Sequence, residues 1–297
     1  MSRRTKIVLA FLGGWALLLI LFGIIFGTHR THSEFLPQNE FKLDPWISLP
    51  GPFDVNKAIL YLIIAAVLTV GTMTYVARRM QQRPNRVQTG VELLYTQMRD
   101  NIVGGNMDRR TAAKWFPFIA ALFLFIWYSN LIGYIPLPTN TNEKFELFGV
   151  QIPAFALFAA TANVSVPLAL ALVVFISFNV EGIRAKGVGG YLKSLLPPGI
   201  HGPAAIPIFF LELLSTCLRL VSLSVRLFAN ILSGHLIILF MSGGLAVLLG
   251  LAWVGILTIP LGIALFIFEV GLVATLQAFI FAVLSAIYIG GAVAESH

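Results

Sequence analysis

Residues 212–235 read ELLSTCLRLVSLSVRLFANILSGH and set a row of polar side chains inside sequence that is apolar on both sides. Between residues 202 and 294 the chain carries only four formal charges, at Glu212, Arg219, Arg226 and Glu269. The first three are seven residues apart, and because each step of seven drifts by only about 20° around a helix, they share one face. Asn230 falls on the same face. Charged groups at membrane depth usually mark an ion or substrate path, and a buried, mutually paired structural row is the alternative.

The composition indicates a polytopic membrane protein. Of the 297 residues, 58% are hydrophobic and 11% are charged, and the mean hydropathy is +0.87, which leaves too few charges for a soluble surface. The net charge of +7 comes mainly from the ends of apolar segments, where membrane orientation and anionic headgroups explain it, so we expect no nucleic-acid partner. The single cysteine, Cys217, allows no intramolecular disulfide, and no Cys/His spacing supports a metal site.

The apolar segments predict an all-α fold with about six membrane-embedded helices and one amphipathic surface helix, in a single domain over 1–297. The predicted segments are an N-terminal helix over 7–26, spans over 58–77, 115–135 and 153–180, a surface helix over 87–114, and two long segments over 203–242 and 245–294. The first of these is either a retained helix, which we favour, or a signal peptide. Arginines cluster between residues 78 and 86, which predicts that the surface helix is cytoplasmic.

The last two segments are too long to cross a membrane upright. Forty helical residues extend about 60 Å, whereas the hydrocarbon core is about 30 Å thick. The two segments must therefore tilt strongly, kink or fold back, with Gly243 and Gly244 in a hairpin between them and Pro260 as a kink. A tilted pair presents a long flank to a neighbour in the bilayer, which predicts a partner subunit.

The charges of the row predict two roles. Arg226 stays charged under ordinary conditions, so it suits a gate that a carboxylate must pass and not a proton carrier. Glu212 lies fourteen residues earlier on the same face, about 21 Å along the helix. Together with Ser222 it suits an inward half-channel, and an ion pair with Arg219 is the alternative.

His235 lies nine residues past Arg226 and points to nearly the opposite side of a straight helix. It faces the following segment, in which Glu269 is the only charge. A histidine beside a buried carboxylate is a candidate proton relay, and a hydrogen-bonded core histidine is the alternative. With Asn230 and Gln277 these residues form a candidate outward half-channel.

Asn163 and Ser165 are either helix-packing groups or the outer mouth of that path. Two offset half-paths separated by one arginine imply that something outside the chain carries the ion from one to the other.

The stretch SVRLFANILSGHL at 224–236 resembles the signature of subunit a of the F-type ATP synthase, the stator of its membrane sector. The resemblance covers about residues 40–297 and includes three further stretches: WFPFIAALFLFIWYSNLIGYIP at 115–136, TANVSVPLALAL at 161–172 and TLQAFIFAVLSAIYIGGAV at 275–293. It implies that two long tilted helices lie against a ring of c subunits, whose carboxylates take protons from one half-channel and release them into the other. It also implies b-type peripheral stalk subunits, the remainder of the F0F1 complex and the lipid bilayer as partners.

By position, the resemblance implies that Arg226 is the essential arginine. Asn230 matches the family's amide, Gln277 its glutamine and Glu212 the acidic residue of its inward path. His235 stands where family members carry either a histidine or a carboxylate. Family members often carry an ionisable group seven residues before the glutamine, whereas Glu269 is eight before. Asn163 and Ser165 stand where members place an acid or amide pair, and residues 1–27 look like an addition.

We therefore expect a non-catalytic, ion-translocating stator subunit in a bacterial inner membrane with its C-terminus cytoplasmic, an organellar membrane being the alternative. No G-x-x-x-x-G-K-[ST] loop occurs, so we expect neither ATP binding nor a cofactor. A self-contained ion-coupled secondary transporter is the rival function, although its usual pseudo-repeats are missing and the intramembrane charges belong to one helix pair. An intramembrane serine protease is disfavoured, because Ser233 and His235 are about 200° apart on one helix.

Overall fold

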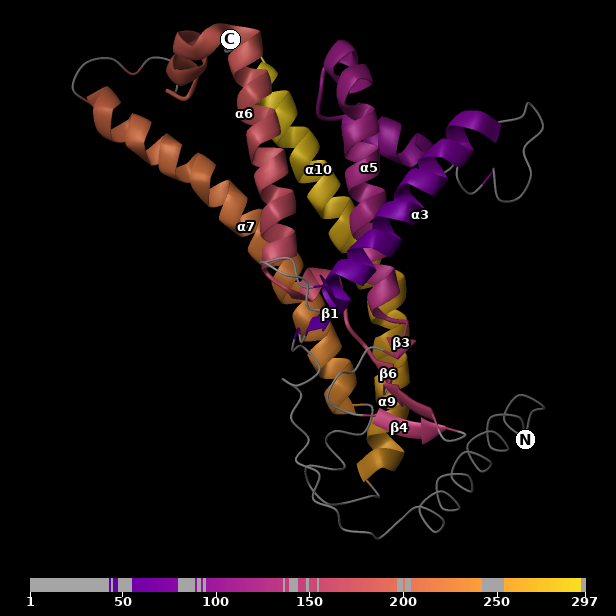
Figure 1. Ribbon diagram of the computed structural model, residues 1–297. Helices are drawn as coiled ribbons and strands as arrows, with labels where there is room; N and C mark the ends of the chain where they lie inside the picture. The colour runs from indigo at the N-terminus through magenta and orange to yellow at the C-terminus, as the bar shows by residue number, and fades with distance from the viewer. Residues whose placement is uncertain are drawn as a thin grey trace, which may run out of the picture.

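The structure is a computed structural model that describes most of the chain from residue 55 onward (Figure 1). The described residues are 43, 45–47, 55–79, 89, 92, 95–135, 137–138, 144–147, 150–153, 155–196, 200, 204–241 and 254–294. The predicted helix over 7–26 and the predicted hairpin turn at Gly243 and Gly244 lie outside these residues.

Long apolar helices make up most of the described chain. They are α3 (Lys57–Arg79), α5 (Arg109–Gly133), α6 (Ser165–Ser194), α7 (Ala205–Leu239), α9 (Val254–Phe268) and α10 (Ala274–Val293). A π-helical turn, η5 (Glu269–Val273), joins α9 to α10 without a break. Within the described residues, five helices are long and apolar enough to cross a membrane. The prediction of an all-α polytopic membrane protein is confirmed.

Short elements precede or connect the long helices. They are the π-helix η1 (Gln97–Val103), the 3-10 turn η2 (Ala160–Ala162), and three antiparallel pairs: β1 (Pro45–Ile47) with β2 (Val55–Asn56), β3 (Leu137–Pro138) with β6 (Phe155–Ala156), and β4 (Lys144–Leu147) with β5 (Val150–Pro153). Figure 1 shows β3, β4 and β6 at the end of the molecule opposite the C-terminus. Two-stranded ribbons have no core of their own, so the class stays all-α.

The predicted span over 153–180 is wrong at both ends. Residues 150–153 and 155–156 pair as strands, and α6 begins only at Ser165, whose backbone N–H donates to Asn163 Oδ1 at 3.0 Å. The helix then continues to Ser194, beyond the predicted end of the span at residue 180. Gly187 interrupts it with a φ of 72°, a conformation that residues with a side chain rarely adopt.

The predicted surface helix over 87–114 is also divided. Residues 95–103 are helical, but a turn at 104–106 ends that segment and α5 starts at Arg109. Asp108 caps α5 by accepting hydrogen bonds from the backbone N–H groups of Arg110 and Thr111, each at 3.1 Å. Asp, Asn, Ser and Thr are preferred at this position because they satisfy the first free N–H groups of a helix.

The helices pack side by side in the order α3, α5, α10, α6, α7. Fully buried side chains in the central cluster include Ile119, Ile126, Leu227, Ile231 and Ile289. The end of α5 approaches the chain before η2 so closely that a Cβ on Gly133 would lie 2.5 Å from that of Ala159. This close packing brings the end of α5 against the second half of α7.

The outer flanks of α3 and α7 carry exposed apolar side chains. On α7 these include Ile206, Phe210, Leu214 and Leu218, of which Ile206 is 66% exposed. Figure 1 shows α7 (orange) leaning away from α6 toward its N-terminal end. Contiguous apolar surface of this kind suits a lipid or protein environment and not water.

Candidate functional site

The polar row of α7 lies on the outer flank of that helix. Arg219, Ser222 and Arg226 are exposed, and Glu212 and Asn230 are half-buried. The Arg219 guanidinium carbon lies 5.5 Å from the ring centroid of Tyr288 on α10, within the range of a cation–π contact.

Arg226 has no hydrogen bond, ion pair or ring contact in the part of the chain that the structure describes. The row is therefore neither buried nor mutually paired, unlike the purely structural alternative. In the membrane, a guanidinium on this flank needs a partner from outside the described chain.

On the inner side of α7, three side chains from three helical segments meet. Tyr134, just past the end of α5, is 3% exposed, and its ring lies 4.6 Å from that of His235, centroid to centroid. The Tyr134 hydroxyl donates to Glu269 Oε2 at 3.1 Å. We call Tyr134, His235 and Glu269 the outward cluster.

The Glu269 carboxylate packs against the backbone of α7 at Gly234, where an added Cβ would lie 2.4 Å from Glu269 Oε2. Only a residue without a side chain leaves room for the carboxylate at this position. The sequence places Gly234 beside His235, and this contact explains why a glycine suits the last part of α7.

His235 makes no hydrogen bond to Glu269. Its Nδ1 lies 3.0 Å from the carbonyl oxygen of Ile231 and its Nε2 lies 3.2 Å from that of Gly133. A neutral imidazole carries one N–H and donates to only one of these carbonyls at a time. The direct pairing of His235 with Glu269 is therefore replaced by an arrangement in which Tyr134 touches both.

The π-helical turn explains the spacing between Glu269 and Gln277. Glu269 begins η5, and Gln277 follows on α10, where it is 6% exposed. A π-helical turn accommodates one extra residue, because its hydrogen bonds run from i to i+5. Glu269, eight residues before Gln277, thus occupies the helix face that a residue seven before would occupy on a regular α-helix.

A second buried polar group lies beside the outward cluster. Thr161 of η2 donates to Asn130 Oδ1 at 2.8 Å, and Asn130 Nδ2 donates to the carbonyl oxygen of Ala274 at 3.3 Å. At the start of α6, the backbone N–H of Ser165 donates a hydrogen bond to the side chain of Asn163. Ser165 is exposed and Asn163 is half-buried. Their hydrogen bond begins the helix, and η2 packs against α7 nearby.

Sequence reasoning missed Tyr134 and Asn130. Tyr134 lies in the stretch at 115–136 that carries part of the resemblance, at the end of the predicted span over 115–135. The available signal was a hydroxyl-bearing aromatic residue immediately after a buried helix, since a buried Tyr usually hydrogen-bonds its hydroxyl to a partner.

At the opposite end of the helices, Lys114 of α5 forms an ion pair with Glu181 of α6.

Nothing in the described residues resembles a metal centre, because no group of three or more His, Cys, Asp or Glu side chains lies close enough together to hold an ion. Cys217 is exposed on α7.

Comparison with known proteins gives consistent matches. Residues 59–290 match the family model for the ATP synthase A chain. The chain is 32% identical over 261 residues to ATP synthase subunit a of Myxococcus xanthus, with 84% of this chain and 78% of that protein covered. It is 34% identical over 237 residues to the subunit a of Rubrobacter xylanophilus, covering 79% and 83%. It is 33% identical over 274 residues to that of Bradyrhizobium diazoefficiens, covering 88% and 98%.

Proposed function

The chain belongs to the ATP synthase A chain family, and from that premise we propose that it is the stator subunit that supplies two offset proton half-channels to a ring of c subunits. Arg226 separates the half-channels. The observation that carries this proposal is the exposed, unpaired Arg226 on the flank of α7. Placing an arginine at the centre of a membrane helix costs about 3 kcal/mol or more, so a carboxylate that visits Arg226 from a partner is the simplest compensation.

The outward half-channel is assigned to the outward cluster together with Asn230 and Gln277. Tyr134, His235 and Glu269 each carry an exchangeable proton or an acceptor, and Tyr134 contacts both of the others. His235 is nine residues from Arg226, about 14 Å along α7. A proton that leaves this cluster toward the outer flank of α7 therefore reaches the ring of c subunits on one side of Arg226.

The inward half-channel is assigned to Glu212 and Ser222, which lie on the other side of Arg226 along α7. Glu212 is half-buried and makes no ion pair with Arg219 among the described residues. Asn163 and Ser165 are assigned to the outer mouth, since η2, which immediately precedes them, packs against both α5 and α7.

In this proposal the chain neither binds nor hydrolyses ATP. Its partners are the c-subunit ring, b-type peripheral stalk subunits and the remainder of the F0F1 complex, and it forms a single membrane domain. The C-terminal end of α6 and the start of α5 lie at the same end as the C-terminus (Figure 1). The last part of α6 carries Arg184 and Lys193, and α5 starts with Arg109. The positive-inside rule makes that end cytoplasmic, in a bacterial plasma membrane. A self-contained secondary transporter, the rival function, would move protons without a ring of c subunits. An experiment can therefore distinguish the two functions.

The test is ATP-driven proton pumping by membrane vesicles that carry Arg226→Ala, compared with Arg184→Ala, an exposed arginine of α6 outside the row. Copurification with the ring and stalk subunits verifies assembly. We expect the assembled Arg226→Ala complex to lose coupled pumping and Arg184→Ala to retain it. Normal pumping by an assembled Arg226→Ala complex would refute the gate, and pumping by the chain without a ring would favour the transporter.

A further inference from the structure

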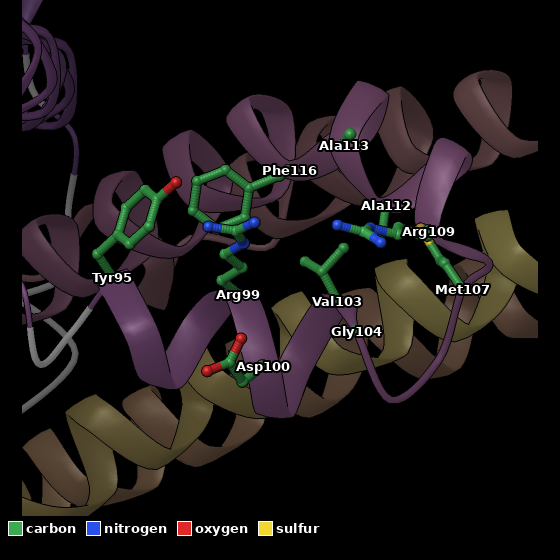
Figure 2. A pocket seen from close by; sticks show the side chains of 10 residues that line it. All are labelled: Tyr95, Arg99, Asp100, Val103, Gly104, Met107, Arg109, Ala112, Ala113 and Phe116. Atoms are coloured by element: carbon green, nitrogen blue, oxygen red, sulfur yellow. The ribbon is translucent and has the colours of Figure 1, made fainter.

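A cavity of about 420 Å³ lies between η1 and the first two turns of α5, away from the ion path (Figure 2). Its walls include the ring of Phe116 and the side chains of Val103 and Ala112. Tyr95 closes one side, with its ring 4.8 Å from that of Phe116 in an edge-to-face contact. The floor is therefore apolar, and the chemistry of the opening depends on the charged residues around it.

Two arginines line this cavity. Figure 2 shows the side chains of Arg99, from η1, and Arg109, from the start of α5, reaching over the same opening. Asp100 of η1 also lines the cavity, and it forms no ion pair with either arginine among the described residues. Neither guanidinium forms an ion pair in the described part of the chain. Two unpaired guanidiniums beside one cavity favour an anion with several oxygens, because each guanidinium can donate two parallel hydrogen bonds to a phosphate.

The cavity lies at the start of α5, where charged residues give way to the apolar part of that helix. Arg109 begins α5, and the apolar run of that helix starts at Trp115. A ligand at this level meets lipid headgroups on one side and hydrocarbon on the other.

An apolar groove of about 330 Å³ lies farther along α5. It is lined by Met98 and Ile102 of η1, by Phe123, and by Leu276 and Phe279 of α10. Phe123 is seven residues beyond Phe116, so both rings lie on nearly the same face of the helix. The groove is therefore positioned to receive a hydrocarbon chain that extends from the cavity.

We propose that this site binds an anionic phospholipid, with its phosphate between Arg99 and Arg109 and an acyl chain in the apolar groove. A free phosphate shares the headgroup chemistry but has nothing to place in the groove. Such a lipid would hold η1 against α5 and α10 at the cytoplasmic surface. The site is independent of the half-channels, so it stands or fails separately from the proposed function.

The test is photo-crosslinking of the assembled complex in vesicles that contain phosphatidylglycerol or phosphatidylcholine with a photoreactive group on one acyl chain. Labelled peptides are identified by mass spectrometry. We expect phosphatidylglycerol to label residues 95–123 and 272–279 roughly thirtyfold more than phosphatidylcholine, since two basic side chains contribute to the selectivity. Arg99→Gln with Arg109→Gln removes that preference.

The matched control is Arg184→Gln with Lys193→Gln, two exposed cations of α6 that do not line the cavity; it should label like the unmodified chain. Ala113→Trp fills the cavity without changing charge and should also abolish labelling, which covers the case in which the arginine variant fails to assemble. Equal labelling by the two lipids, or unchanged labelling in both cavity variants, overturns the proposal. Full displacement of the lipid by inorganic phosphate would assign the site to a free anion instead.

Discussion

Gly234→Ala tests whether the position of the Glu269 carboxylate matters to proton flow. In the structure, the new Cβ would lie 2.4 Å from Glu269 Oε2 and 2.5 Å from Cδ, and ordinary Cβ contacts begin at 3.4 Å. The carboxylate must therefore withdraw by about 1 Å or change rotamer. Its hydrogen bond from the Tyr134 hydroxyl is 3.1 Å long, so a withdrawal away from Tyr134 breaks it.

The variant should still fold. Replacing glycine by alanine within a helix contributes about 0.5–1 kcal/mol of stability, and an off-rotamer glutamate costs about 0.5–1.5 kcal/mol. The two effects nearly cancel. Misplacing a reacting group by about 1 Å can reduce a rate by roughly a hundredfold, so we expect passive proton conduction and ATP-driven pumping to fall at least about tenfold at normal assembly.

The matched control is Gly291→Ala on α10, where an added Cβ meets nothing within 4 Å; it should pump normally. Combining Gly234→Ala with Glu269→Asp shortens the carboxylate side chain by one methylene and should recover part of the flux. Full activity of an assembled Gly234→Ala complex would refute the reasoning, because it would show that the packed position of Glu269 is irrelevant to the path.

Three further predictions follow from local contacts. Tyr134→Phe removes the hydroxyl but keeps the ring, so we expect a several-fold loss of initial proton uptake with unchanged thermal stability; equal uptake would remove this residue from the path. Lys114→Met should lower the thermal stability of the solubilised complex by about 1–3 kcal/mol, more than Glu181→Gln, because it leaves a buried carboxylate unpaired; the reverse order would contradict this. Hydrogen bonds from the side chain and backbone of Thr111 lower the pKa of Asp108 below 3.8, so its stabilising effect is complete above the unfolded pKa and is lost as pH falls through the folded value. Asp108→Asn should therefore flatten the loss of thermal stability between about pH 5 and pH 3, and an unchanged pH profile would contradict this.

Local pattern was sufficient for much of the molecule. The seven-residue spacing of Glu212, Arg219 and Arg226 places them on one flank whatever surrounds the helix, because the phase of a helix depends only on its own residues. Span lengths and hydropathy likewise predicted the all-α membrane class. The beginning of α6 could not be predicted, since the apolar residues 153–164 suit a strand and a 3-10 turn as well as a helix. Only strand pairing with residues 137–138 and 144–147 and packing against α5 decide between them.

The sequence by itself determined which residues each helix presents to a common face, including the exposed row around Arg226. Only the tertiary structure decided which faces meet. The sequence left open whether His235 pairs with Glu269, and in the structure the ring of Tyr134 contacts His235 while its hydroxyl donates to Glu269. The π-helical turn shifts the phase between Glu269 and Gln277 by one residue. Such contacts depend on the axial position of one helix against another, which is set by close approaches such as Gly133 to Ala159 and leaves no periodic signal in the chain.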